Sequence, residues 1–201
     1  MNMNPPENKT GFAQEVDAVT LARARRGDVS AHASLYRTFS RPCYTLAMRV
    51  LGSSATAEDI VQDVFLKMMD AIKQYRGDAP FGAWLKRMTV NAAIDHLRSQ
   101  RSINGEDPEQ LFANTADSGA SLASDVHDAI GLLQRLPPRA RLILVLHEVE
   151  GYTHKELAEL FGQTESYSKS ILSRSLKRLQ DWLNTTRVEV ELQAWPSRNS
   201  I

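Results

Sequence analysis

Two short helical patterns joined by a glycine-containing turn, between residues 151 and 179, constrain the fold of this chain most strongly. In the first pattern apolar residues recur at helical spacing, and Gly162 follows where a left-handed residue commonly ends a helix. Thr164 or Ser166 can cap the second helix. The residues of the second helix that we expect to point inward are Ile171, Leu172, Leu176 and Leu179. This pattern predicts a helix-turn-helix or, alternatively, a packed helical hairpin without a DNA-binding role.

The polar face of the second helix is basic and carries short side chains. Its residues are Lys169, Ser170, Ser173, Arg174, Lys177 and Arg178. A helix with such a face can lie in the major groove beside phosphates. The formal net charge of the whole chain is zero, which taken alone argues against nucleic-acid binding. That total hides an uneven distribution, because residues 103–126 hold five Asp and Glu and no Lys or Arg.

The acidic stretch also divides the chain into domains. Residues 102–125 are rich in Gly, Ser, Asn and Asp without sustained periodicity, so we expect a flexible acidic linker there. The domains on either side are expected at 18–101 and 126–184. No β signal stands out in them, so the predicted fold class is all-α, with two small helical domains. In the tail, 185–201, apolar residues alternate with Glu in a strand-like manner, which indicates pairing with a partner or disorder.

The N-terminal domain has a nearly continuous helical pattern. We expect helices over 19–26, 30–39 and 43–51, with a break at Arg41–Pro42, and a fourth helix capped by Thr56. The apolar stripe of that fourth helix consists of Val61, Phe65, Met68 and Ile72. A stripe of this width predicts a helix packed in the core.

A fifth helix, expected from residue 81 to about residue 100, follows an aromatic-containing loop at 75–81 and has basic residues on its outer side. Asn91 is costly in the middle of a helix, and Asp95 lies one turn away from it. One interpretation is that Asn91, Asp95 and Arg98 simply bond one another or cap a neighbouring helix. The other is that this helix binds single-stranded or melted DNA through phosphate contacts and base stacking.

Other functional classes have little support in the sequence. The five His residues are scattered, no catalytic triad order is convincing and no Gly-rich phosphate loop occurs, so we expect no catalytic site and no cofactor. The single cysteine, Cys43, excludes an internal disulfide and cannot form a thiolate metal cage, so no metal site is expected. The longest apolar run, 142–146, is far below the roughly 20 residues of a membrane span. With no signal peptide at the start, we expect a cytoplasmic protein without membrane contact.

Two separate stretches of the chain are similar to bacterial sigma factors of the extracytoplasmic-function (ECF) type, the two-domain members of the sigma-70 family. Residues 57–98, AEDIVQDVFLKMMDAIKQYRGDAPFGAWLKRMTVNAAIDHLR, resemble region 2 of these proteins. Residues 132–179, LLQRLPPRARLILVLHEVEGYTHKELAELFGQTESYSKSILSRSLKRL, resemble region 4. Residues 21–39 also fit the way such proteins begin. The order of the two stretches, with an acidic linker between them, is more specific than a helix-turn-helix alone.

The resemblance implies a non-enzymatic factor that binds core RNA polymerase and directs promoter recognition, strand opening and initiation. The residues implied in core polymerase binding are Asp59, Gln62, Asp63 and Phe65. Those implied at the minus-ten element, where a base of the melted non-template strand would be flipped out, are Arg76, Lys86, Arg87, Asn91 and Arg98. Those implied at the duplex minus-thirty-five element are Ser166, Lys169, Ser170, Ser173, Arg174 and Arg178. An anti-sigma protein is a further partner that the resemblance implies.

Two positions of the recognition helix depart from the family pattern. Ser168 stands where the family usually has Val, and Ile171 where it usually has Arg. The alternative function is a dimeric helix-turn-helix regulator that binds duplex DNA without polymerase. Against it, no heptad seam is evident, and a long acidic linker would not hold two half-sites at fixed spacing.

Overall fold

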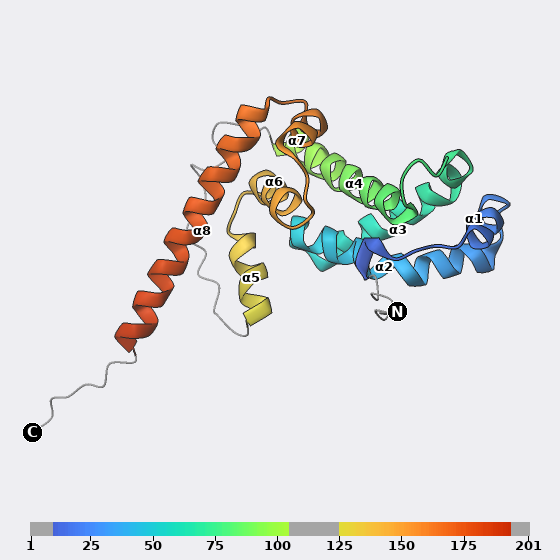
Figure 1. The fold of residues 1–201 in the computed structure, drawn as a ribbon. Helices are drawn as coiled ribbons and strands as arrows, with labels where there is room; N and C mark the ends of the chain where they lie inside the picture. Colours follow the sequence, from blue (N-terminus) through green and yellow to red (C-terminus); the bar gives the residue numbers. More distant parts are fainter. Residues whose placement is uncertain (1–9, 105–124, 194–201) are drawn as a thin grey trace, which may run out of the picture. The chain divides into compact units, whose positions relative to one another are not determined.

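A computed structural model describes residues 10–104 and 125–193, and every element in these ranges is a helix. The chain divides into two compact units, Met1–Gly105 and Glu106–Ile201, which we call the N-terminal and C-terminal units. Figure 1 shows the helices of each unit. The prediction of an all-α fold with two small helical domains is confirmed. The predicted flexible linker lies almost entirely outside the described residues.

Three long helices form the body of the N-terminal unit. Its elements are η1 (Gly11–Ala13), α1 (Ala18–Arg25), α2 (Val29–Leu51), α3 (Ser54–Ala71), η2 (Ile72–Gln74) and α4 (Phe81–Asn104). Helices α2, α3 and α4 all contact one another (Figure 1). The largest fully buried side chains of this core are Leu35, Phe39, Val50, Val64, Met68, Ile72 and Leu85. Each stabilises the unit by about 1.5–3 kcal/mol relative to an exposed position. The predicted stripe of α3 is buried throughout.

Helix α2 runs without a break through Pro42, so the expectation of two separate helices there is wrong. Proline has no N–H, which leaves the carbonyl of Thr38, four residues earlier, without its helical donor. The side-chain amide of Gln14 donates to this carbonyl, with 3.1 Å between Nε2 and O, and also to the carbonyl of Gly11 at 3.0 Å. The replacement donor comes from a distant segment, so the local sequence pattern does not reveal it.

Replacing Gln14 with alanine is expected to lower the free energy of unfolding of the N-terminal unit by about 1–2 kcal/mol, because the Thr38 carbonyl then has no side-chain donor. Urea unfolding followed by circular dichroism measures the change. The control is Gln74→Ala at an exposed position, which should change stability by no more than about 0.5 kcal/mol. Equal stability of the two variants would contradict this role for Gln14.

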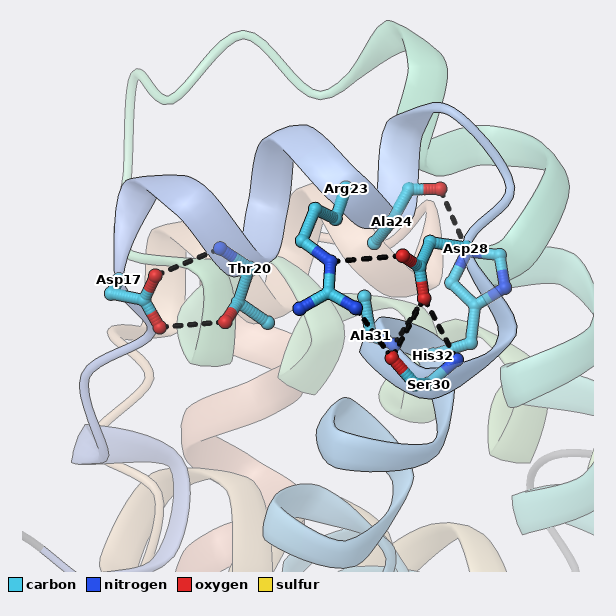
Figure 2. A network of polar contacts seen from close by, with 8 residues as sticks. All are labelled: Asp17, Thr20, Arg23, Ala24, Asp28, Ser30, Ala31 and His32. Atoms are coloured by element: carbon cyan, nitrogen blue, oxygen red, sulfur yellow. Dashed lines mark hydrogen bonds and ion pairs between the residues drawn. The ribbon is translucent and has the colours of Figure 1, made fainter.

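A polar network fixes the corner between α1 and α2 (Figure 2). The carboxylate of Asp28 caps α2 by accepting from the backbone N–H of Ser30 at 2.9 Å, and it accepts from Arg23 Nε at 2.9 Å. The Arg23 and Ser30 side-chain hydrogen bonds hold the pKa of the Asp28 carboxyl well below its ordinary value. The buried His32 ring donates from Nε2 to the carbonyl of Ala24 at 2.8 Å. The C-terminal end of α1 is therefore anchored to the first turn of α2.

The junction of α2 and α3 is shorter than the sequence indicated. Gly52 ends α2 in the left-handed conformation, with φ of 76°, and its N–H donates to the carbonyl of Met48 at 2.9 Å. Ser53 then caps α3, accepting from the N–H of Thr56 at 3.3 Å. The expectation that Thr56 is the cap is wrong, because Gly52 already reverses the chain and lets the next helix start at once.

Within residues 125–193 the C-terminal unit contains four helices, and α7 and α8 form the predicted helix-turn-helix. The four helices are α5 (Asp125–Gln134), α6 (Pro138–Glu148), α7 (His154–Phe161) and α8 (Glu165–Gln193). The turn at Gly162 is confirmed, with φ of 61°. Of the two candidate caps of α8, Thr164 is the one that accepts a backbone N–H, that of Tyr167, at 3.1 Å. Helix α6 is buried from Ala140 to Leu146 and contacts both α7 and α8, so it is the centre of this unit.

Helix α8 continues to Gln193, so the strand-like interpretation of the tail is wrong up to that residue. A lone strand has no partner for its backbone groups, whereas a helix pairs them within itself. No Gly or Pro interrupts the sequence between Gly162 and Pro196, so nothing ends the helix sooner. Residues 194–201 lie outside the described part of the chain.

Candidate nucleic-acid interfaces

The first half of α8 separates into a buried face and a polar face. The buried residues are Ser168, Ile171, Leu172 and Ser175. Of the predicted DNA contacts, Ser166, Lys169, Ser173 and Arg174 are exposed, and Ser170 and Arg178 are half-buried. Leu176 is exposed, so its expected inward position is wrong. It lies about 80° around the helix from Ser168, whereas Ser175 lies close to the middle of the buried face.

Ser168 is held by His154, whose ring lies against that of His147. Its hydroxyl lies 3.0 Å from Nδ1 of His154, the first residue of α7. The His154 ring lies against that of His147 near the end of α6, with 4.4 Å between ring centroids and 36° between the ring planes. Because Ser168 is buried, its hydroxyl needs a hydrogen-bond partner, and His154 provides it. The contact connects α8 with α7 directly, and with α6 through the ring of His147.

We expect the stability of the C-terminal unit to fall as the pH drops below the ordinary His pKa of about 6.5. The pKa of His154 is lowered by burial first, then by the charges of His147 and Lys169, with Glu165 and Glu148 acting in the opposite direction. A lowered pKa means that the folded unit favours the neutral ring, so this stabilisation is complete above the ordinary value and is lost towards acid.

The measurement is the Tm of the wild type and of His154→Gln at about pH 7.5 and about pH 5, on either side of the ordinary His pKa. The wild type should lose more Tm than this variant. His96→Gln, which removes a histidine of α4 in the other unit, should behave as the wild type does. If the His154 variant shows the wild-type dependence on pH, the assignment of the effect to this ring is wrong.

In the N-terminal unit, three of the predicted minus-ten residues share one side of α4. Arg87, Asn91 and Arg98 are exposed and fall within about 40° of one another around the helix. Lys86 is half-buried and lies about 100° away from Arg87, so it is not part of this row. Arg76 lies in the η2–α4 loop (residues 75–80), highly exposed and paired with Asp78 at 3.1 Å.

The ion pair of Asp95 and Arg98 tests whether Asn91, Asp95 and Arg98 simply bond one another. The two groups approach to 3.8 Å, and both side chains are mostly exposed. Exposed pairs of this kind contribute little to stability, so Arg98 can exchange Asp95 for a phosphate at small cost. Asn91 is exposed and is not part of this pair. The bonding of all three side chains to one another therefore does not explain the position of Asn91.

Helix α3 presents polar and apolar side chains together on its outer side. Asp59, Gln62 and Asp63 are exposed there, as a polymerase contact requires. Phe65 is only 6% exposed and packs edge-on against Tyr36, so its ring cannot serve as a surface contact. Leu66 is 64% exposed, and the sequence interpretation missed it. The available signal was its spacing, since it follows Asp63 by three residues on the polar side of the helix.

The described residues give no other candidate site of the kinds considered from the sequence. Within residues 10–104 and 125–193, no three His, Cys, Asp or Glu side chains gather as they would around a metal ion. Among the described helices, none has both the length and the apolar character needed to cross a membrane. Cys43 is buried, which raises the pKa of its thiol to about 11. This thiol is therefore an apolar core group at neutral pH.

Comparisons with known proteins identify the family. Residues 35–103 match sigma-70 region 2, and residues 128–179 match sigma-70 region 4. The chain is 31% identical over 178 residues to the ECF RNA polymerase sigma factor SigM of Mycobacterium tuberculosis, covering 87% of this chain and 90% of that relative. This chain belongs to the ECF sigma factors. It is also 29% identical over 160 residues to the RNA polymerase sigma-H factor of Pseudomonas aeruginosa, covering 73% of this chain and 83% of that protein.

Two solved structures share the fold of this ECF sigma factor. RpoE in complex with the anti-sigma factor NepR, from Bartonella quintana, gives a TM-score of 0.54 at 22% identity, covering 78% of this chain and 98% of that one. CnrH in complex with the cytosolic domain of CnrY gives 0.51 at 23% identity, covering 83% and 96%. The region 2 match spans most of α2, all of α3 and nearly all of α4. The region 4 match ends within α8, at residue 179.

Proposed function

We propose that this ECF sigma factor binds core RNA polymerase through α3 and directs it to promoters, with each unit binding a different DNA element. One observation carries the proposal. The two matched regions lie in different units, and each unit has a helix whose exposed side is basic and hydrogen-bonding: α4 in the N-terminal unit and α8 in the C-terminal unit. Two DNA-binding helices in one chain fit a promoter with two separated elements.

The first turns of α8 would lie in the major groove of the minus-thirty-five element. Lys169 and Arg174 bring positive charge to the phosphates, and the exposed hydroxyls of Ser166 and Ser173 can bond phosphates or base edges. Lys169 pairs with Glu165 at 3.5 Å, and a phosphate can replace this partner because both side chains are largely exposed. The departure at Ile171 has its explanation in packing, since the side chain is buried beneath the DNA-facing side.

The η2–α4 loop and the exposed row of α4 would bind the minus-ten element. Arg76, Arg87 and Arg98 can hold phosphates of the non-template strand, and Asn91 can offer both a donor and an acceptor to a base edge. A base of the melted strand would be flipped out beside the loop, which costs least where the base step is already weak. Lys86 would contribute charge from the flank of this row.

The outer side of α3 would bind core polymerase. It combines the acidic and amide groups of Asp59, Gln62 and Asp63 with the exposed apolar side chains of Leu66 and Met69. An apolar centre with a polar margin is the usual composition of a protein interface. Leu66 and Met69 therefore replace Phe65 as the apolar contacts of this surface.

We also propose an anti-sigma protein as a partner, because both RpoE and CnrH are in complex with other proteins, NepR and CnrY. Exposed apolar side chains occur in both units, Leu66 and Met69 in one and Leu176 and Leu183 in the other, and such a partner could cover them. The sigma factor would act in the cytoplasm, and the polymerase, not this chain, would supply the catalysis. The dimeric regulator is not favoured, since relatives matched over most of their length are RNA polymerase sigma factors.

The test is reconstitution of the purified chain with core polymerase, followed by run-off transcription from genomic promoter fragments. We expect the chain to co-elute with core polymerase and to permit specific transcripts that core polymerase alone does not make. Templates melted in advance at the minus-ten element separate strand opening from later steps. Tight binding to duplex DNA as a dimer, without any association with polymerase, would overturn the proposal.

A further inference from the structure

Tyr75 closes the η2–α4 loop at its base. The side chain is 9% exposed, and its ring packs against Phe81 at 5.6 Å and Trp84 at 5.2 Å between centroids. Its hydroxyl donates to the carbonyl of Ala79 at 2.5 Å. The first residue of the loop therefore holds the backbone near the last residue, and it is itself held by the start of α4.

Arg25, the last residue of α1, holds the same tyrosine from the other side. Its guanidinium donates to the backbone carbonyl of Tyr75 and lies 5.7 Å from the centroid of the Tyr75 ring. The end of α1 is in turn anchored to α2 by the polar network at Asp28 (Figure 2). Arg25 thus connects a rigid corner, far away in the sequence, to the base of the loop.

The start of α4 is also fixed. Gly82 packs so closely on the backbone of η1 that a Cβ there would collide with the carbonyl of Phe12. The tip of the loop is different, because the side chains of Arg76 and Asp78 are 83% and 75% exposed. Gly77 between them has φ of 87° and nothing close to the place of a Cβ. The base of the loop therefore has its shape before any ligand arrives, and the tip is open to one.

We propose that Arg25 is a positioning residue for promoter recognition: by holding the carbonyl and ring of Tyr75, it pre-forms the η2–α4 loop for the melted minus-ten strand. The inference rests on the proposed function of that loop. Without Arg25 the loop must be ordered when DNA binds, and this ordering reduces the affinity. Arg25 acts through Tyr75 and need not contact DNA itself.

The test measures binding of the reconstituted holoenzyme to a single-stranded minus-ten oligonucleotide by fluorescence anisotropy, over a range of salt concentrations. Arg25→Ala should weaken binding about tenfold and leave affinity for core polymerase unchanged, with the N-terminal unit still folded by circular dichroism. Arg25→Lys, which keeps a donor, should recover part of the loss. Tyr75→Phe, which removes the hydroxyl bond to Ala79 and keeps the ring, should weaken binding less than Arg25→Ala. The matched control is Arg26→Ala, which removes the same charge from the neighbouring exposed position and should alter binding less than twofold.

The salt dependence distinguishes positioning from direct contact. A positioning residue leaves the slope of log affinity against log salt unchanged, whereas loss of a phosphate contact reduces it by about 0.7 on a single strand. A reduced slope for Arg25→Ala, or an effect equal to that of Arg26→Ala, would overturn the inference. Arg76→Ala and Arg87→Ala test the site itself. If both bind normally, the proposed minus-ten site fails; if both weaken binding and Arg25→Ala does not, only the positioning role fails.

Discussion

Changing both Leu66 and Met69 of α3 to aspartate is expected to weaken association with core polymerase at least about 100-fold, close to complete loss in a co-elution experiment. Both side chains are exposed, so the fold does not depend on them. In the complex they would form the apolar centre of the contact, where two added carboxylates would be buried without partners. Repulsion between these added carboxylates and those of the neighbouring Asp59 and Asp63 would add to the cost.

The control for this variant is aspartate at Val19 and Val29, two exposed apolar residues of α1 and α2 in the same unit. This control should bind polymerase as the wild type does. Thermal unfolding of both double variants shows whether the N-terminal unit remains folded. Wild-type affinity for polymerase after the Leu66 and Met69 changes would place the docking surface elsewhere.

Alanine at both Lys169 and Arg174 is expected to weaken binding of the holoenzyme to a promoter by about 2–4 kcal/mol. Both side chains are on the exposed polar face of α8, opposite the buried residues that hold the helix in place. Removing them therefore takes away DNA contacts without loosening the unit. If both hold phosphates, the slope of log affinity against log salt should also fall by about two.

Gln180→Ala with Asn184→Ala is the matched control for these changes, because both residues are exposed on the same helix beyond the DNA-facing turns. The measurement is a titration of holoenzyme on a labelled promoter, with core polymerase affinity determined separately. Affinity of the Lys169 and Arg174 variant within twofold of the control would mean that α8 does not read the minus-thirty-five element in this way.

The features predicted correctly from the sequence are those that neighbouring residues determine. The helix-turn-helix follows from the spacing of apolar residues, the left-handed Gly162 and the capping hydroxyl of Thr164, all within a few residues of one another. The same is true of the α3 stripe. Local rules were sufficient there because no distant group alters the outcome.

Several of the features that the sequence did not reveal depend on tertiary contacts. Pro42 should end a helix, and it does not because Gln14 supplies a donor to the freed carbonyl of Thr38. Phe65 belongs to the core stripe. Its neighbour Leu66 is exposed, and only the packing of α3 in the unit shows which of the two side chains lies at the surface. The contact of Arg25 with Tyr75 joins residues fifty positions apart, so no local pattern could reveal it.

The measurement that tests the central claim most directly is a footprint on promoter DNA with permanganate detection of unpaired thymines, with and without core polymerase. With polymerase, we predict protection of both the minus-thirty-five and the minus-ten elements and reactive thymines at the minus-ten element. The chain alone should open no DNA. Protection of a palindromic duplex by the chain alone, unchanged by polymerase and without reactive thymines, would contradict the account.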